Sequence, residues 1–257
     1  RRILTGTLDG IEQTTGGKTL ATVSFRGFRI AIPIREMLVL DERMPSGRAY
    51  ADYMNRLNRI LGTMLGAEID FIVKGIDSTT HSAVASRREA MLRKRQTFYF
   101  GKDVSGNPYI YPGRLVEARV IAVAEKVLRV EAFGIECAIF ARDLSWQWVS
   151  DVRDLYSVGD RVLVRVQEIS GEDVEHLSIR ADIRSTFSET SVDNLKKCQV
   201  QSKYAGKVTD LRGGVVYIRL NNGVNAIAHT CYDSRMPGKK DDVSFAVTRL
   251  DEEHGIA

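Results

Sequence analysis

One eleven-residue pattern occurs three times in this chain, and it restricts the fold more than any other feature. Each copy has a glycine, a short apolar strand and a polar exit: GFRIAIPIREM (27–37), GIECAIFARDL (134–144) and GVNAIAHTCYD (223–233). An internal repeat means that one supersecondary unit is used several times. We therefore expect three copies of a small fold rather than one large domain of 257 residues.

The residues around each copy also match. Upstream, two alternating polar and apolar segments join through a polar turn, as half-buried strands do. Downstream, a connection of variable length leads to another alternating strand: GAEIDFIVKGID (66–77), VGDRVLVRVQEIS (158–170) and KDDVSFAVTRLD (240–251). A last strand follows in the first two copies, whereas only HGIA remains in the third. This layout predicts a five-stranded Greek-key barrel, the OB-fold.

The first copy carries the longest connection. Apolar residues between Ser46 and Leu65 recur at steps of three and four, which predicts an amphipathic helix. Ser46 is the expected N-cap, and Gly62 or Gly66 the expected end. The helix either closes the barrel or offers a groove to a partner. The predicted fold is mainly β, with three tandem barrels at residues 1–97, 98–188 and 189–257, the first with an inserted helix and the third truncated in its last strand.

Charge is distributed unevenly. Residues 1–100 carry 16 Lys and Arg against 10 Asp and Glu, residues 101–195 carry 11 against 16, and residues 196–257 carry 10 against 7. A polyanion would meet basic ends and an acidic middle. The three cysteines are widely spaced and form no CxxC pair, so we expect neither a zinc site nor disulfides, and a cytoplasmic location. No apolar run approaches the roughly 20 residues of a membrane helix.

The second copy resembles a known family. Its segments DLSW (143–146), VGD (158–160) and LSIR (177–180) fill the signature of the S1 domain, the RNA-binding module named after the first protein of the bacterial small ribosomal subunit. The third copy is similar at GKV and GVNAIAHT, and the first at GFRIAIPIREM and ASRREAM. The resemblance implies a tandem array that binds single-stranded RNA in translation or RNA handling, with no catalytic segment.

In this family, two aromatic residues on the second strand and a histidine ending the third form a platform on which bases stack, while cations follow the phosphates. The resemblance places Tyr217 and His229 of the third copy at two of these positions, whereas Gly214 leaves the first aromatic position empty. The phosphate contacts that it implies in this copy are Lys207, Arg212 and Arg219.

The other two copies depart from the family pattern. In the second, Lys126 and Arg129 replace the two aromatic residues, and Phe140 replaces the histidine. Arg180 fills the basic position on the fifth strand. Guanidinium planes can stack on bases, so binding is compatible with this set; alternatively, a neighbouring domain covers Phe140. In the first copy Thr19, Thr22 and Pro33 replace the platform, and only Arg87 and Arg88 remain.

The linker after the first copy holds a basic run, RREAMLRKR (87–95), which is either a solvated face or a phosphate-binding segment. TGGKT (15–19) lacks the earlier glycine of a phosphate-binding loop and is interpreted as a hairpin tip. His229 and Cys231 alone are too few ligands for a metal site. No serine, cysteine or carboxylate pair has a general base nearby in the sequence. We therefore predict a protein that is not an enzyme and holds no metal or cofactor.

Two functions remain open. The first is single-stranded RNA binding. The second is an OB-fold array that serves mainly as a protein-docking module, favoured by two depleted platforms and the acidic middle domain. By analogy with the leading modules of ribosomal protein S1, the first domain is expected to contact the ribosome or other proteins.

Overall fold

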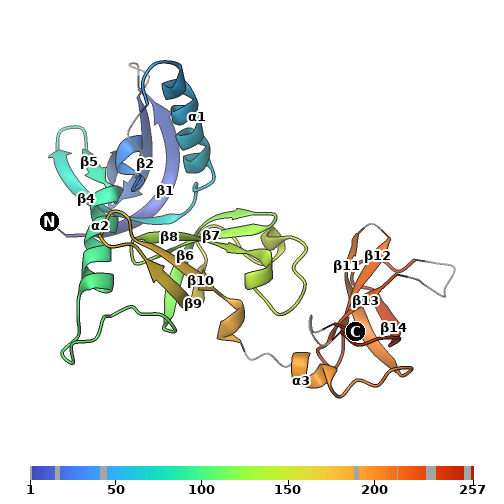
Figure 1. The fold of residues 1–257 in the computed structure, drawn as a ribbon. Coiled ribbons are helices and arrows are strands. Elements are labelled where there is room, and N and C mark those ends of the chain that lie inside the picture. Colours follow the sequence, from blue (N-terminus) through green and yellow to red (C-terminus); the bar gives the residue numbers. More distant parts are fainter. Residues whose placement is uncertain are drawn as a thin grey trace.

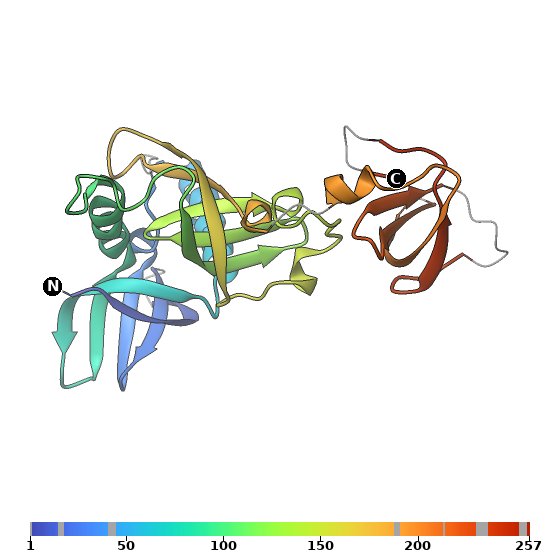
Figure 2. The same cartoon turned by 90° about the horizontal axis from the view of Figure 1, so that it is seen from below.

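The computed structural model describes residues 2–14, 18–40, 45–187, 191–212, 214–229, 236–251 and 256–257. Its strands form three sheets in chain order, and each sheet encloses an apolar core. The first two lie side by side, and the third stands apart beyond the second (Figures 1 and 2). The predicted mainly β fold of OB-type barrels is confirmed. Within the described part of the chain, no helix is long and apolar enough to cross a membrane.

The first sheet is a closed barrel with the order β1-β2-β3-β5-β4. All neighbouring strands are antiparallel except β3 and β5, whose parallel pairing closes the barrel. This is the connectivity of an OB-fold. The strands are β1 (Leu4–Gln13), β2 (Thr19–Phe25), β3 (Phe28–Pro33), β4 (Glu68–Asp77) and β5 (Ser82–Ser86).

The helix inserted in the first barrel is α1 (Arg48–Gly62). Leu57 and Leu61 are fully buried in the barrel core, as is Met64 just after the helix, so this segment closes the barrel. The helix ends at Gly62, one of the two expected ends. The expected cap was wrong, because the N-cap residue is Gly47 in a left-handed conformation and no side chain caps the helix.

The second sheet has the order β10-β9-β6-β7-β8, and β8 and β10 lie next to each other at its open side. Its valine-rich strands alternate between buried and exposed residues, as half-buried strands do. The strands are β6 (Leu115–Ala124), β7 (Val127–Ala132), β8 (Ile135–Phe140), β9 (Arg161–Ser170) and β10 (Ser178–Asp182).

The third sheet has the order β13-β12-β11-β14 and is preceded by the short α3 (Ser191–Leu195). Ile256 forms a parallel bridge with Asn225, and the amide of Ala257 donates to the Asn225 carbonyl at 3.0 Å. This repeats the parallel pairing of β3 with β5, so the final residues occupy the place of a fifth strand. The strands are β11 (Lys203–Arg212), β12 (Val215–Leu220), β13 (Asn225–Ala228) and β14 (Asp242–Ala246).

The glycine that opens each repeated segment has one structural role. Gly27, Gly134 and Gly223 have φ angles of 82°, 89° and 87°, and each lies in the turn between the second and third strands of its sheet. Glycine adopts this left-handed conformation without the steric cost that a Cβ brings. The pattern is therefore repeated because the same tight turn is built three times.

The basic run after the first barrel is a helix, α2 (Arg87–Arg95), rather than a linker. Ser86 caps it by accepting a hydrogen bond from the Glu89 amide at 2.9 Å. Arg95 donates to three carbonyls of the second barrel region, including that of Gly134 at 2.7 Å. A Cβ on Gly134 would lie 2.3 Å from the carbonyl oxygen of Met91 in α2. The helix thus packs directly against the turn that opens β8.

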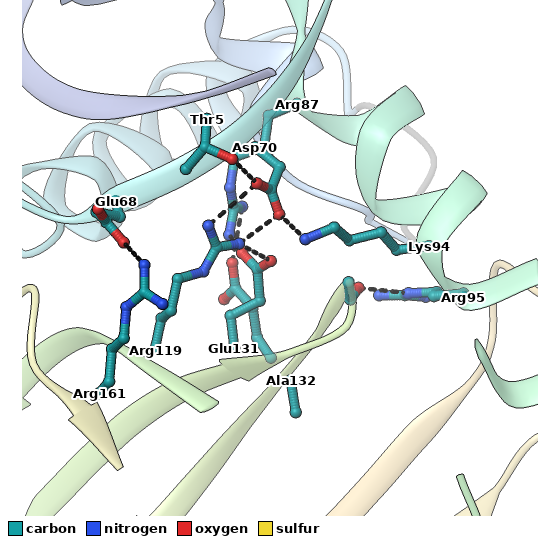
Figure 3. A network of polar contacts seen from close by, with 12 residues as sticks. Thr5, Glu68, Asp70, Arg87, Lys94, Arg95, Arg119, Glu131, Ala132 and Arg161 are labelled. Atoms are coloured by element: carbon teal, nitrogen blue, oxygen red, sulfur yellow. Dashed lines mark hydrogen bonds and ion pairs between the residues drawn. The ribbon is translucent and has the colours of Figure 1, made fainter. Parts of the chain in front are cut away.

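A buried charge network joins the first two barrels (Figure 3). Asp70 of β4 accepts hydrogen bonds from Arg119 of β6 at 2.5 Å and from Lys94 of α2. Arg119 also donates to Glu131 of β7 at 2.8 Å, and Glu131 pairs with Arg87. Burial alone would raise the pKa of Asp70, but its cationic partners hold it at about 2.

The two barrels also share apolar contacts. Ile121 of β6 is fully buried in the core of the first barrel, and Val158 packs against the same cluster. Apolar side chains and charge pairs therefore fix the two barrels together. Ion pairs cross this junction in both directions: Arg87 of α2 pairs with Glu131, and Asp70 of β4 pairs with Arg119.

Candidate nucleic-acid interface

Tyr217 and Arg219 lie on the outer face of the third barrel. Along β12 they alternate with the buried Val216, Ile218 and Leu220, so their side chains point away from the core. Arg219 is opposite Asn225 of β13 and donates to its side-chain oxygen at 3.0 Å. Partial burial lowers the pKa of Arg219. The register therefore places an aromatic and a basic side chain on one surface.

Two further residues predicted in the third barrel border this surface. His229 is exposed and follows β13 directly, one residue past the Val216–Ala228 pair. Lys207 of β11 is opposite Arg219, is exposed, and lies 3.6 Å from the carboxylate of Asp242. The side chain of Arg212 lies outside the described part of the structure. Four of the five residues predicted in this barrel are therefore found near one face.

An unpredicted residue, Trp148, stacks on Tyr217. The ring centroids are 4.7 Å apart and the planes differ by 11°. Trp148 belongs to the second barrel, in the connection between β8 and β9, and its indole Nε1 donates to Asp210 of β11 at 3.3 Å. Sequence reasoning used Trp146, which completes the DLSW motif, but not Trp148. A second tryptophan in a short polar loop was the signal that could have identified it.

The predicted cations of the second barrel are tied to local acceptors. Arg129 of β7 donates to Glu136 at 2.5 Å and is about a quarter exposed. Burial raises the pKa of Glu136, but Arg87 and Arg129 beside it lower the pKa further, so the net shift is downward. Lys126, in the turn before β7, donates to the Ser150 carbonyl. Both cations are therefore engaged within the second barrel, although the Lys126 side chain is 39% exposed.

Phe140 and Arg180 are exposed on the second barrel. Phe140 ends β8 with 49% of its surface exposed, so no domain among the described residues covers it. The guanidinium of Arg142 lies 5.7 Å from its ring centroid. Arg180 of β10 lies 3.2 Å from the Glu168 carboxylate, and both side chains are exposed. Exposed pairs of this kind contribute little and exchange partners readily. Both residues can therefore meet a ligand.

The structure excludes Arg87 from the predicted RNA-binding set. Its side chain is fully buried, lies 2.5 Å from Glu131 and 2.8 Å from Glu136, and donates to the Met37 carbonyl. Burial lowers the pKa of Arg87, but the two carboxylates outweigh this and raise it. A buried guanidinium with these partners cannot reach a phosphate. Arg88 is partly exposed and pairs with Glu175 at 3.0 Å.

The basic run therefore fits neither of its two expected interpretations, since α2 uses its cations mainly to attach the second barrel. Within the described residues, no group of histidines, cysteines and acids could hold a metal. Cys231 and residues 15–17 of the TGGKT segment lie outside the described residues. The flanking residues are described, and Gln13 at the end of β1 pairs with Thr19 at the start of β2.

Comparison with known proteins supports the S1 resemblance. Residues 110–179 match the model of the S1 RNA-binding domain. The chain is 21% identical over 201 residues to small ribosomal subunit protein bS1 of Coxiella burnetii, covering 75% of this chain and 35% of that protein. For bS1 of Mycobacterium tuberculosis the identity is 21% over 171 residues, or 66% of this chain and 34% of that protein. The chain thus spans about a third of the length of these relatives.

Two solved structures are also similar. One is an a/eIF2alpha-aDim2p-rRNA complex from Pyrococcus horikoshii, at 20% identity and a TM-score of 0.27, covering 35% of this chain and 53% of that chain. The other is a multidomain protein with nucleic acid binding domains from Streptococcus pneumoniae, at 10% identity and a TM-score of 0.22. The match covers 99% of this chain and 70% of that chain. Scores this low carry no argument. The family match therefore identifies an S1 RNA-binding domain within this chain, at residues 110–179.

Proposed function

We propose that this chain is a non-catalytic protein that binds single-stranded RNA in the cytoplasm, in translation or RNA handling. The observation that carries the proposal is the outer face of the third barrel, where Tyr217 and Arg219 share a surface with Lys207 and His229 nearby. The proposed function uses three binding units, with boundaries near residues 97 and 188.

A single strand is the ligand that this chemistry favours. Aromatic side chains on an OB-type face stack on unpaired bases, whereas bases in a duplex are already stacked and inaccessible. Exposed cations on the second and third barrels, such as Lys207 and Arg180, supply phosphate contacts. Each such contact releases counterions, so affinity should fall as salt rises.

Fluorescence anisotropy with a labelled oligouridylate of about 12 nucleotides, a length within the range of OB-fold site sizes, tests the proposal. We expect binding that weakens steeply between about 50 and 200 mM salt. Tyr217→Ala should cost roughly 1 to 3 kcal/mol, and Tyr217→Phe should retain most of the affinity. An absence of salt-dependent binding to any homopolymer at low ionic strength would refute the proposal.

The first barrel favours a second role, contact with a protein such as a ribosomal component. This barrel has a cavity of about 220 Å³ with an apolar lining that includes Phe25, Phe28 and Ile76, and Ile76 is 67% exposed. Exposed apolar surface of this kind often marks protein contacts. Ile76→Asp should abolish nuclease-resistant co-purification of protein partners from the native cell while leaving RNA affinity unchanged. Unchanged partners would exclude this role.

A further inference from the structure

The loop that carries Trp148 makes hydrogen bonds, an ion pair and a ring stack to the third barrel. Besides the stack on Tyr217, the carbonyl of Trp146 accepts from Asn225 at 2.6 Å, and Lys239 lies 3.4 Å from Asp154. The two apolar cores share no residue. This loop therefore contacts the third barrel directly at the candidate stacking face.

Trp148 offers a further stacking surface at this position. Tyr217 covers one face of the indole ring, yet 45% of Trp148 remains exposed. An aromatic ring has two faces, and stacked rings extend by adding a third ring to the free face. Every nucleobase has such a π-face. The Tyr217–Trp148 pair is therefore a stack that a base can lengthen without displacing either residue.

Two lysines from different barrels converge on Ser150, two residues beyond Trp148. The Ser150 carbonyl accepts from Lys126 of the second barrel, and its hydroxyl oxygen lies 3.1 Å from the Nζ of Lys239 of the third. Two ammonium groups held beside one residue suit a phosphate, which can accept from both. Glu125 and Asp154 lie 3.6 and 3.4 Å from these lysines, but such exposed pairs are weak and a phosphate can replace them.

We infer that Trp148, Lys126 and Lys239 form a composite nucleotide site spanning the second and third barrels. A base of single-stranded RNA stacks on the free face of Trp148, and a neighbouring phosphate lies between the two lysines. Trp148 thereby supplies the aromatic surface that the chain lacks at Gly214. This inference rests on the proposed function and adds to it a bridging site that orders the two barrels around the RNA.

A competing model makes the opposite prediction. If Trp148 only covered Tyr217, RNA would have to displace it, and removing the indole would tighten binding. In the composite site, removing the indole weakens binding. The sign of the change in affinity on Trp148→Ala therefore separates the two.

The experiment measures binding of short oligoadenylate and oligouridylate to the whole chain. Trp148→Ala should weaken binding about tenfold, the equivalent of a stack worth 1.4 kcal/mol, and Trp148→Phe should restore most of it. Tyr111→Ala is the matched control, because Tyr111 is 46% exposed and lies in the loop before β6. Lys126→Ala and Lys239→Ala should each reduce the slope of log binding constant against log salt concentration by about one. Lys18→Ala, on the first barrel, should leave this slope unchanged.

A spectroscopic readout follows Trp148 directly. The chain has two tryptophans, so Trp146→Phe leaves Trp148 as the only one, and its emission should be quenched by RNA at low salt and recover at high salt. If the wild type binds RNA but Trp148→Ala binds equally well or more tightly, the composite site is wrong while the proposed function stands. If the wild type binds no RNA, the proposed function itself fails.

Discussion

The guanidinium of Arg87 and the carboxylate of Glu131 belong to different barrels, yet both side chains are buried and their closest nitrogen and oxygen atoms lie 2.5 Å apart. Such a pair contributes little net stability relative to apolar residues, but each member depends on the other. This pair therefore couples the stability of α2 to that of the second barrel.

Removing Arg87 should destabilise the protein far more than removing its neighbour. Arg87→Ala leaves Glu131 and Glu136 with fewer partners in a buried site, and breaking a buried pair costs about 3 to 5 kcal/mol. Arg88→Ala removes an exposed pair with Glu175, worth at most about 1 kcal/mol. Urea unfolding of the two variants measures the difference. Similar losses would mean that the buried pair does not hold the junction.

Acid should weaken the same junction. The pKa of Asp70 lies at about 2 in the folded protein against an ordinary value of 3.8, so its contribution is complete above the ordinary value. That contribution is lost as pH falls through the folded pKa, and it amounts to roughly 2 kcal/mol. Asp70→Asn should be less stable at pH 7 but lose less between about pH 5 and pH 2. Asp52→Asn, on the exposed surface of α1, should follow the wild-type pH profile.

Substituting the repeated glycine should affect the barrels unequally. In both Gly27→Ala and Gly134→Ala, a Cβ is forced into a left-handed backbone, at a cost of about 1 to 2 kcal/mol. A Cβ at Gly27 meets no atom within 4 Å, whereas one at Gly134 lies 2.3 Å from the Met91 carbonyl oxygen. Thermal unfolding should therefore show a larger loss for Gly134→Ala. Equal losses would mean that α2 shifts away at no cost.

The sequence predicted what depends on local pattern. Strand alternation and the apolar face of α1 specify elements whose neighbours are near in the chain, and the structure contains these strands and this helix. Arg87 and Trp148 were misjudged or missed because their environment is set by contacts between barrels, with Glu131 and with Tyr217. The periodicity of the sequence does not indicate which face of one barrel packs against another barrel.

The same limit applies to charge. A net charge summed over a segment treats every charged side chain as exposed to water. On that basis the acidic second barrel was expected to repel RNA. In the structure, Glu131 and Glu136 face Arg87 and Arg119 rather than solvent. Arg119 and Arg129 of the same barrel also pair with these or neighbouring carboxylates, so the net charge of the segment does not describe the charge that the second barrel presents to a ligand.

Phe140 provides a test of the second barrel's own contribution to RNA binding. Its ring is half exposed at the end of β8, in the position where the family has a histidine, and Arg142 lies beside it. If a base stacks there, Phe140→Ala should weaken oligonucleotide binding by roughly 1 to 3 kcal/mol, with little change in stability because the ring contributes little to the core. Phe100→Ala, at a similarly exposed phenylalanine, should keep the wild-type affinity. Equal affinity of Phe140→Ala and wild type, in anisotropy titrations at low salt, would confine base stacking to the surface around Tyr217.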